Sequence, residues 1–439
     1  MATHAEKWTR NPTDSAVDAD LPVGTGFVTV ENDIWSRLAR YSLYVAVFFS
    51  GWTLLRTGFA NFTLADLAVA VAFLILFARG QLRSLPFGWM TPVWLVGLIL
   101  MLGGLLFSTL INGDVTRWLI VAGQYLFAFL LLPMVLMGRD VRFTRRLPLI
   151  FAAGTAVSQT IGIASSYIWT YAETASVFGD GFVTGNGRIG AMTGEPNLNA
   201  AMVAMSLAML IYCIRTRRIP IFPAIVCAIP LVWGLLASGS FTGFGAAVIA
   251  VSIMIAISGI RVFFKVGVVA AIIGAIFFAS GAPLPTVFEE RVASALSTGD
   301  INQAGSYTGR AALIRDAWEN AENTIVVGVG VDRFREVSQF GAPVHVLHLL
   351  IWNEGGLVAF LGLLMLIAAL IVFALRAVSH NREEGAMILA VIAVFMIYTF
   401  SIPHMYSRQW IMPIMLALST FYAMRGRLPV GLEYRRRVR

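Results

Sequence analysis

The chain contains twelve apolar segments, each about as long as a helix that crosses a membrane. A helix needs about 20 mostly apolar residues to span the hydrocarbon core of a bilayer. Hydrophobic residues make up 58% of the 439 residues and charged residues only 13%, whereas soluble domains contain about 25% charged residues. The sequence therefore excludes an ordinary soluble protein. It predicts an all-α integral membrane protein with about twelve transmembrane helices, over residues 39–55, 61–78, 91–110, 118–138, 147–169, 197–214, 219–238, 241–259, 262–281, 348–375, 386–403 and 409–424.

The basic residues gather in every second loop between these segments. If the N-terminus is cytoplasmic, the cytoplasmic side carries 23 basic and 10 acidic residues, and the opposite side carries nine basic and 13 acidic residues. Cytoplasmic loops of membrane proteins carry an excess of Lys and Arg, so this distribution predicts that both termini are cytoplasmic. The net charge of +8 then reflects orientation in the bilayer, and no nucleic-acid partner is expected.

The predicted organisation has five parts. Residues 1–38 are polar and read as a disordered cytoplasmic tail. Spans one to nine follow over residues 39–281, and spans ten to twelve cover residues 348–424. Between them, residues 282–347 form a large loop on the outer side, which in a bacterium would be the periplasmic face of the inner membrane. Residues 425–439 are a basic cytoplasmic tail.

The large outer loop is the best candidate for the site of chemistry. Loops longer than about 15 residues are usually functional or disordered, and the amphipathic stretch at residues 308–320 predicts a partly helical loop. The cytoplasmic loops are short and carry no nucleotide-binding fingerprint, and no metal motif is evident. No cofactor is therefore expected.

The charged side chains on the outer side are of a selective kind. Every basic residue there is arginine, whose planar fork of donors fits phosphate and keeps its charge. Histidine is the side chain best suited to accept a proton near neutral pH. These residue types suggest a reaction on a phosphate-bearing lipid, although solvated charges and interfacial anchors are the plainer interpretation. The residues are Arg56, Arg117, Arg188, Arg291, Arg310, Arg315, Arg333, Arg335 and Arg408, with His345, His348 and His404.

The segment from His345 to Leu357 resembles the signature of the O-antigen ligase and polysaccharide polymerase superfamily. In that signature a histidine ends the large periplasmic loop, a glutamate follows nine residues later and a glycine eleven residues later, as His345, Glu354 and Gly356 do here. Other short matches are the Gly-x-Gly turn at Gly328-Val329-Gly330, the loop arginine Arg310, and an Arg…Pro-Asn…Ala pattern at Arg188, Pro196, Asn197 and Ala200.

The chain also departs from the family pattern. The family often has a Ser-Arg-Gly motif at the start of the eighth span, whereas Ser240-Phe241-Thr242-Gly243 has no arginine. The residue after the signature histidine is Val346, and the usual aromatic residue four positions after the loop arginine is Ile314. These departures affect how many arginines hold the phosphates.

The resemblance implies a membrane glycosyltransferase in the bacterial inner membrane. It would transfer a glycan from an undecaprenyl-pyrophosphate carrier to a hydroxyl of a lipid or glycan acceptor in the periplasm, without a metal or a nucleotide sugar. In this interpretation Arg188 and Arg310 bind the pyrophosphate and His345 is the catalytic base. His348, Glu354 and Arg408 are candidates for a supporting role or for the acceptor side.

Other interpretations remain open from the sequence. His348 could simply pack beside His345, Glu354 could form a structural salt bridge, and Arg408 could anchor the chain at the membrane interface. A zinc site at His345 and His348 lacks an evident third ligand. A ligase for lipopolysaccharide or another surface polysaccharide is favoured slightly, a polysaccharide polymerase has the same chemistry, and a lipid-linked glycan transporter or a scaffold protein is the alternative class.

Overall fold

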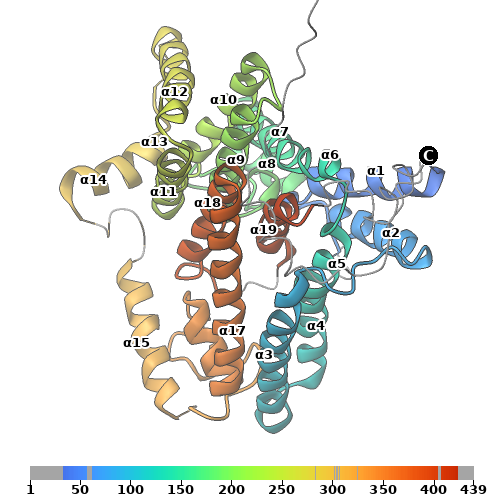
Figure 1. The fold of residues 1–439 in the computed structure, drawn as a ribbon. Helices are drawn as coiled ribbons and strands as arrows, with labels where there is room; N and C mark the ends of the chain where they lie inside the picture. Colours follow the sequence, from blue (N-terminus) through green and yellow to red (C-terminus); the bar gives the residue numbers. More distant parts are fainter. Residues whose placement is uncertain are drawn as a thin grey trace, which may run out of the picture.

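The computed structural model is built of helices (Figure 1). It describes residues 33–56, 62–281, 283–300, 302, 305, 307–323, 325–403 and 407–423. Every regular element within these ranges is a helix. The prediction of an all-α membrane-associated fold is confirmed to that extent, and the two predicted tails lie almost entirely outside the described residues.

In the described part of the chain twelve helices have 14 or more residues, and ten of them contribute to a shared apolar core. Each of the twelve predicted apolar segments contains a helix. In the segment 118–138 this helix is the shorter α4 (Val115–Leu126), which η4 (Phe127–Leu131) and α5 (Leu132–Leu136) extend. The long helices are α1 (Ile34–Phe48), α2 (Leu64–Ala78), α3 (Thr91–Asn112), α7 (Leu147–Ile168), α9 (Pro196–Arg215), α10 (Ile221–Ala237), α11 (Phe241–Ser258), α12 (Ile260–Ser280), α15 (Tyr307–Asn323), α17 (Leu347–His380), α18 (Arg382–Tyr398) and α19 (Arg408–Phe421), of which α15 belongs to the large loop.

Shorter helices complete or connect these elements. One of them directly precedes a long helix, three follow one another over the predicted segment 118–138, and the others lie between these elements. They are η3 (Gly88–Met90), α4 (Val115–Leu126), η4 (Phe127–Leu131), α5 (Leu132–Leu136), α6 (Val141–Thr144), α8 (Tyr171–Phe178), η5 (Ala191–Thr193), α13 (Thr286–Phe288), η6 (Glu289–Ala293), α14 (Ser294–Thr298) and α16 (Phe334–Val337).

Five stretches of helix are long and apolar enough to cross a membrane. They are Gly88–Asn112, Val115–Leu136, Val141–Ile168, Pro196–Arg215 and Leu347–His380. Three shorter apolar helices, Leu64–Ala78, Ile221–Ala237 and Phe241–Ile257, fall below that length.

Capping side chains decide where several helices begin. The Asp33 carboxylate accepts a hydrogen bond from the Ser36 backbone N–H at 2.9 Å, so α1 starts at Ile34. A capping carboxylate satisfies a backbone donor that has no partner within the helix. The expected boundary of the N-terminal tail at residue 38 is therefore wrong by several residues, because the polar residue Asp33 acts as a helix cap.

Small residues let α3 and α17 pack closely along much of their length, as Figure 1 shows for the lower part of the molecule. Gly104 of α3 faces the backbone of Ala359, and Gly362 of α17 faces Met101 and Gly97. A Cβ at Gly104 or Gly362 would overlap backbone atoms of the other helix. Glycine at such positions is the usual way in which membrane helices approach one another.

A break at Gly356 divides α17 into a short and a long helix. Gly356 has φ 69° and ψ −172°, which no helix contains. The rings of Trp352 and Phe360 stack with their centroids 4.8 Å apart, although eight residues of straight helix span about 12 Å. The segment that begins beside His345 is therefore separate from the long helix that follows it.

Replacing Gly356 with alanine is expected to destabilise the fold. The residue has a positive φ, and an added Cβ would overlap the carbonyl oxygen of Val326. Strain and overpacking together should lower the free energy of unfolding by about 2 kcal/mol or more. Gly103→Ala is the matched control, since nothing lies within 4 Å of a Cβ there. Thermal unfolding of both variants measures the difference, and equal melting temperatures would contradict it.

The loop over residues 282–347 has a small core of its own. Ala317 of α15, Phe334 of α16 and Leu350 of α17 are buried together, and Ile314 packs against them. The buried carboxylate of Asp316 accepts a hydrogen bond from the Ser338 hydroxyl at 2.7 Å. This core fixes α15 against the first part of α17.

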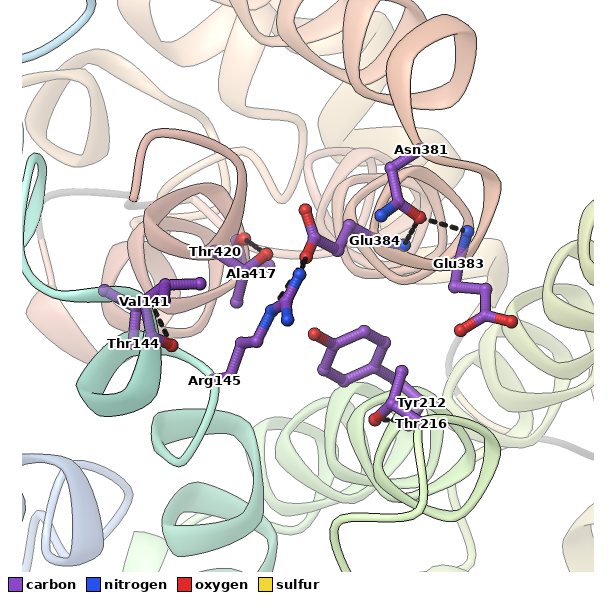
Figure 2. Close-up of polar contacts among 10 residues, drawn as sticks. All are labelled: Val141, Thr144, Arg145, Tyr212, Thr216, Asn381, Glu383, Glu384, Ala417 and Thr420. Carbon is purple, nitrogen blue, oxygen red and sulfur yellow. Dashed lines mark hydrogen bonds and ion pairs between the residues drawn. The ribbon is translucent and has the colours of Figure 1, made fainter. Parts of the chain in front are cut away.

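Two ion pairs hold the N-terminal end of α18, and Figure 2 shows the one between Arg145 and Glu384. Nε and Nη2 of Arg145 donate to Oε1 of Glu384 at 3.1 and 2.8 Å, and Nε of Arg215 lies 3.1 Å from Oε1 of Glu383. The Asn381 side chain caps the helix. In the close-up the hydroxyl of Tyr212 points toward the guanidinium of Arg145. These contacts tie α18 to the Arg145 loop and to α9.

Candidate functional site

Arg188 lies in a hairpin between α8 and α9. The Thr184 backbone N–H donates to the Arg188 carbonyl at 2.9 Å, and Val183 and Ile189 form an isolated bridge. The amide of Asn199 donates to the Ile189 carbonyl at 3.0 Å, and Asn199 and Gln159 exchange two buried hydrogen bonds. Because buried amides need such partners, this network fixes the hairpin on α9 and α7.

The side chain of Arg188 is held by neutral groups. Its Nε donates to the carbonyl of Ser238 at 2.8 Å, and its Nη2 donates to Oδ1 of Asn197 at 2.9 Å. The same Oδ1 accepts from the Ser240 hydroxyl at 3.0 Å, and the Asn197 amide donates to Glu195 at 2.8 Å. Glu195 caps the N-terminus of α9. A hydrogen-bond network of this kind orients a guanidinium without neutralising it directly.

Arg291 reaches the same place from η6. Its Nε donates to the carbonyl of Gly239 at 3.2 Å, next to the Ser238 carbonyl that binds Arg188. Both carbonyls follow the C-terminus of α10, where the helix dipole is negative and favours cations. Two guanidinium groups are thus anchored on neighbouring carbonyls, directly before the Ser240–Gly243 segment.

The charges of Arg291 and Arg310 both act on Arg188. Burial first, and then the positive charge of Arg291 and more weakly that of Arg310, lower the pKa of Arg188, the negative charge of Glu195 opposes them, and the net result is a pKa of about 10. Tyr398 of α18 also acts on Arg188. Arg188 and Arg291 therefore share one anchoring segment, and Arg310 of α15 adds its charge to theirs, which creates a positive region suited to a polyanion.

His345 belongs to the same cluster. It lies just before α17, and two residues later the Leu347 backbone N–H donates to the Thr399 carbonyl at 2.8 Å. Burial lowers the pKa of His345, the positive charge of Arg310 lowers it further, and Glu195 raises it. The Nδ1 atom of His345 is buried and has no hydrogen-bond partner among the described residues. A neutral imidazole with an unpaired nitrogen is in the protonation state that accepts a proton.

The depressed pKa of His345 predicts how transfer depends on pH. Activity that needs the neutral imidazole is lost as pH falls through the pKa of His345, so the acid limb of the kcat/KM profile should lie below the ordinary value of about 6.5. Because Arg310 contributes to the depression, Arg310→Gln should move this limb to higher pH. Arg310→Lys keeps the charge and should leave the limb in place. Equal limbs in the two variants would contradict the assignment.

Two other predicted residues, His348 and Glu354, have different surroundings from those of His345. His348 lies on α17 one turn beyond its start, with its ring 5.1 Å from that of Phe400. The buried carboxylate of Glu354 accepts hydrogen bonds from the backbone of Asp332 and Phe334. Glu354 thus holds the loop that follows the Gly-x-Gly turn, and no charge–charge contact with the arginine cluster is evident from its surroundings. His404 lies outside the described residues.

Arg408 forms an ion pair with Asp66 at the N-terminal end of α2. Only 17% of the Arg408 side chain and 3% of the Asp66 side chain are exposed. The guanidinium also lies over the ring of Phe127. These contacts connect α19 to α2, and they give Arg408 a structural partner.

The arrangement contains residues that the sequence did not single out. Arg291 was one of nine outer arginines with no motif around it, and Tyr398 lies in an apolar segment. Their role is visible only in the fold, where Arg291 binds the carbonyl next to that of Ser238 and Tyr398 acts on Arg188.

Among the described residues no three His, Cys, Asp or Glu side chains are grouped so that they could hold a metal ion. No protein-family model and no curated protein matches the sequence.

Proposed function

We propose that this protein is a membrane glycosyltransferase that uses a lipid-pyrophosphate donor. The observation that carries the proposal is that the charge of Arg310 acts on both Arg188 and His345, although the three residues come from segments far apart in the sequence. The same three residues match the signature of the O-antigen ligase and polysaccharide polymerase superfamily. A cluster of arginines beside a neutral histidine fits a reaction in which an anion leaves and a hydroxyl loses its proton.

The chemistry needs no group beyond these side chains. The oxygen of the acceptor hydroxyl forms a bond with the anomeric carbon of the donor glycan, while the bond from that carbon to the pyrophosphate oxygen breaks. The lipid pyrophosphate leaves with the bonding electrons, and Arg188, Arg310 and Arg291 stabilise the charge that develops on it. His345 takes the proton of the hydroxyl, a contribution of roughly 10²–10⁴ in rate for a positioned base.

The membrane orientation is part of this proposal. We infer twelve spans with both termini in the cytoplasm and the cluster on the periplasmic side of a bacterial inner membrane. The distribution of basic residues supports this orientation, and the donor would be an undecaprenyl-pyrophosphate glycan. A ligase that moves a finished glycan to a lipid acceptor is favoured over a polymerase, which would extend the glycan by the same reaction.

The experiment is transfer by the purified full-length protein in nanodiscs. An undecaprenyl-pyrophosphate oligosaccharide is mixed with lipid A-core or with a second lipid-linked oligosaccharide, in the presence of a chelator and without nucleotide sugars. Product on lipid A-core identifies a ligase, and a doubled lipid-linked chain identifies a polymerase. If neither forms, and sealed vesicles instead move the intact donor across the membrane, the proposal is wrong and the protein is a transporter.

A further inference from the structure

The first part of α17 carries buried polar atoms that lack partners. Nδ1 of His348 and Nε1 of Trp352 have no hydrogen-bond partner among the described residues, as is also true of Nδ1 of His345. His348 and Trp352 are four residues apart on a helix, so their side chains lie on the same face. Buried polar atoms without a partner are rare because they lose their hydrogen bonds to water. Three within eight residues suggest that something else supplies the partners.

Exposed aromatic rings lie beside two of these side chains. Phe400 at the end of α18 is 62% exposed and lies 5.1 Å from the His348 ring. Trp318 of α15 is 53% exposed and meets Trp352 edge to face at 6.1 Å. The exposed surfaces of Phe400 and Trp318 are accessible to a ligand beside the side chains that carry the unpaired nitrogens. We call His348, Trp352, Trp318 and Phe400 the aromatic face.

The aromatic face starts at the candidate site and leads away from it. Arg310 and Trp318 lie on α15 eight residues apart, which is about 12 Å of helix. His345 precedes α17, and Trp352 lies seven residues later. Arg310 acts on His345, and Trp318 contacts Trp352. The two segments therefore run side by side, with the charged groups at one end and the tryptophans at the other.

We propose that the aromatic face binds sugar rings of the acceptor, so that the acceptor is a glycan or a lipid carrying one. A sugar ring has faces of C–H groups, which pack against the electron-rich faces of aromatic rings, and a rim of hydroxyl groups, which hydrogen-bond with indole and imidazole nitrogens. The aromatic face offers both. The assignment to the acceptor rests on the proposed function, because His345 at its near end takes the proton of the acceptor hydroxyl.

Binding of glycans without transfer tests this inference. The full-length protein in nanodiscs is applied to an array of neutral and acidic bacterial oligosaccharides, and the strongest ligand is then titrated with intrinsic fluorescence. No donor is present, so glycan binding by a protein that transfers nothing would contradict the proposed function and leave this inference standing. Absence of binding to every oligosaccharide on the array would overturn the inference.

Two variants separate the two kinds of contact. Trp352→Phe keeps an aromatic ring but removes the indole N–H, and Trp318→Ala removes an exposed ring; each should weaken binding about tenfold or more. Trp169→Ala is the matched control, because Trp169 is also exposed, at 41%, and lies at the end of a different helix. It should leave the dissociation constant within about twofold.

An interfacial role for the exposed rings is the competing explanation. Nanodiscs made with brominated lipids would then quench the fluorescence of Trp318, and the quenched fraction would fall in Trp318→Ala while glycan binding stayed unchanged. That combination overturns the proposal. In transfer assays the aromatic-face variants should raise KM for the acceptor and leave KM for the donor unchanged; the reverse pattern would place the donor glycan on this face and equally overturn the acceptor assignment.

Discussion

Arg188→Ala is expected to lower kcat/KM for glycan transfer at least about a hundredfold. The guanidinium is held by the carbonyl of Ser238 and the amide oxygen of Asn197, so it is already oriented before the donor binds. Loss of one preorganised group that stabilises developing charge costs roughly 10²–10³ in rate. Steady-state transfer in nanodiscs measures the effect, with thermal unfolding to show that the variant is folded.

The accompanying variants show whether geometry or charge matters. Arg188→Lys should recover little activity, since an ammonium group cannot reproduce the two directed contacts of the guanidinium. Arg333→Ala is the matched control: this arginine lies in the large loop, outside the Arg188 hairpin, and it is exposed and pairs with Glu336. It should transfer glycan at the wild-type rate. Activity of Arg188→Ala equal to that control would rule out a role for Arg188 in binding pyrophosphate.

The second large effect is expected for stability, at Arg408. Removing this side chain leaves the buried carboxylate of Asp66 without its partner. Breaking a buried ion pair in this way costs about 3–5 kcal/mol, so Arg408→Ala should lower the free energy of unfolding by about that amount. The measurement is reversible unfolding of the purified protein in mixed detergent micelles.

A double substitution provides the control for Arg408. Asp66→Leu together with Arg408→Leu removes both charges, and apolar replacement of a buried pair is often neutral or stabilising. The double variant should therefore be more stable than Arg408→Ala. If Arg408→Ala unfolds like the wild type but transfers glycan more slowly, then Arg408 acts on the acceptor and its contact with Asp66 is incidental.

Helices were predictable from the sequence, whereas their ends and breaks were not. The length and hydropathy of each apolar segment predict where a helix lies, because a helix of apolar residues must bury its side chains. The start of α1 at Ile34 depends on one cap, and the division of α17 depends on one glycine with a positive φ. Neither signal stands out from a pattern that averages over about 20 residues.

The candidate site was predictable only where a motif marked it. Arg188, Arg310 and His345 were found through the family resemblance, and in the fold the charge of Arg310 acts on the other two. No motif marks Arg291, because its contact is with the backbone carbonyl of Gly239, 52 residues away in the sequence. Glu354 lies in the signature, yet its carboxylate binds backbone groups of the Asp332 loop. Spacing along the chain does not distinguish a residue that shapes a loop from one that contacts a substrate.

Helix α18 connects the ion pairs of Figure 2 with the candidate site. Its 17 residues span about 25 Å. Glu384 is fixed by Arg145 at one end, and beyond the other end the Thr399 carbonyl binds the backbone two residues after His345. Because α18 is held at both ends, a shift of the helix along its axis at Glu384 should also move Thr399. Whatever loosens the Arg145–Glu384 pair should therefore misalign His345, so that mutations suppressing a defect at either end are expected to arise at the other.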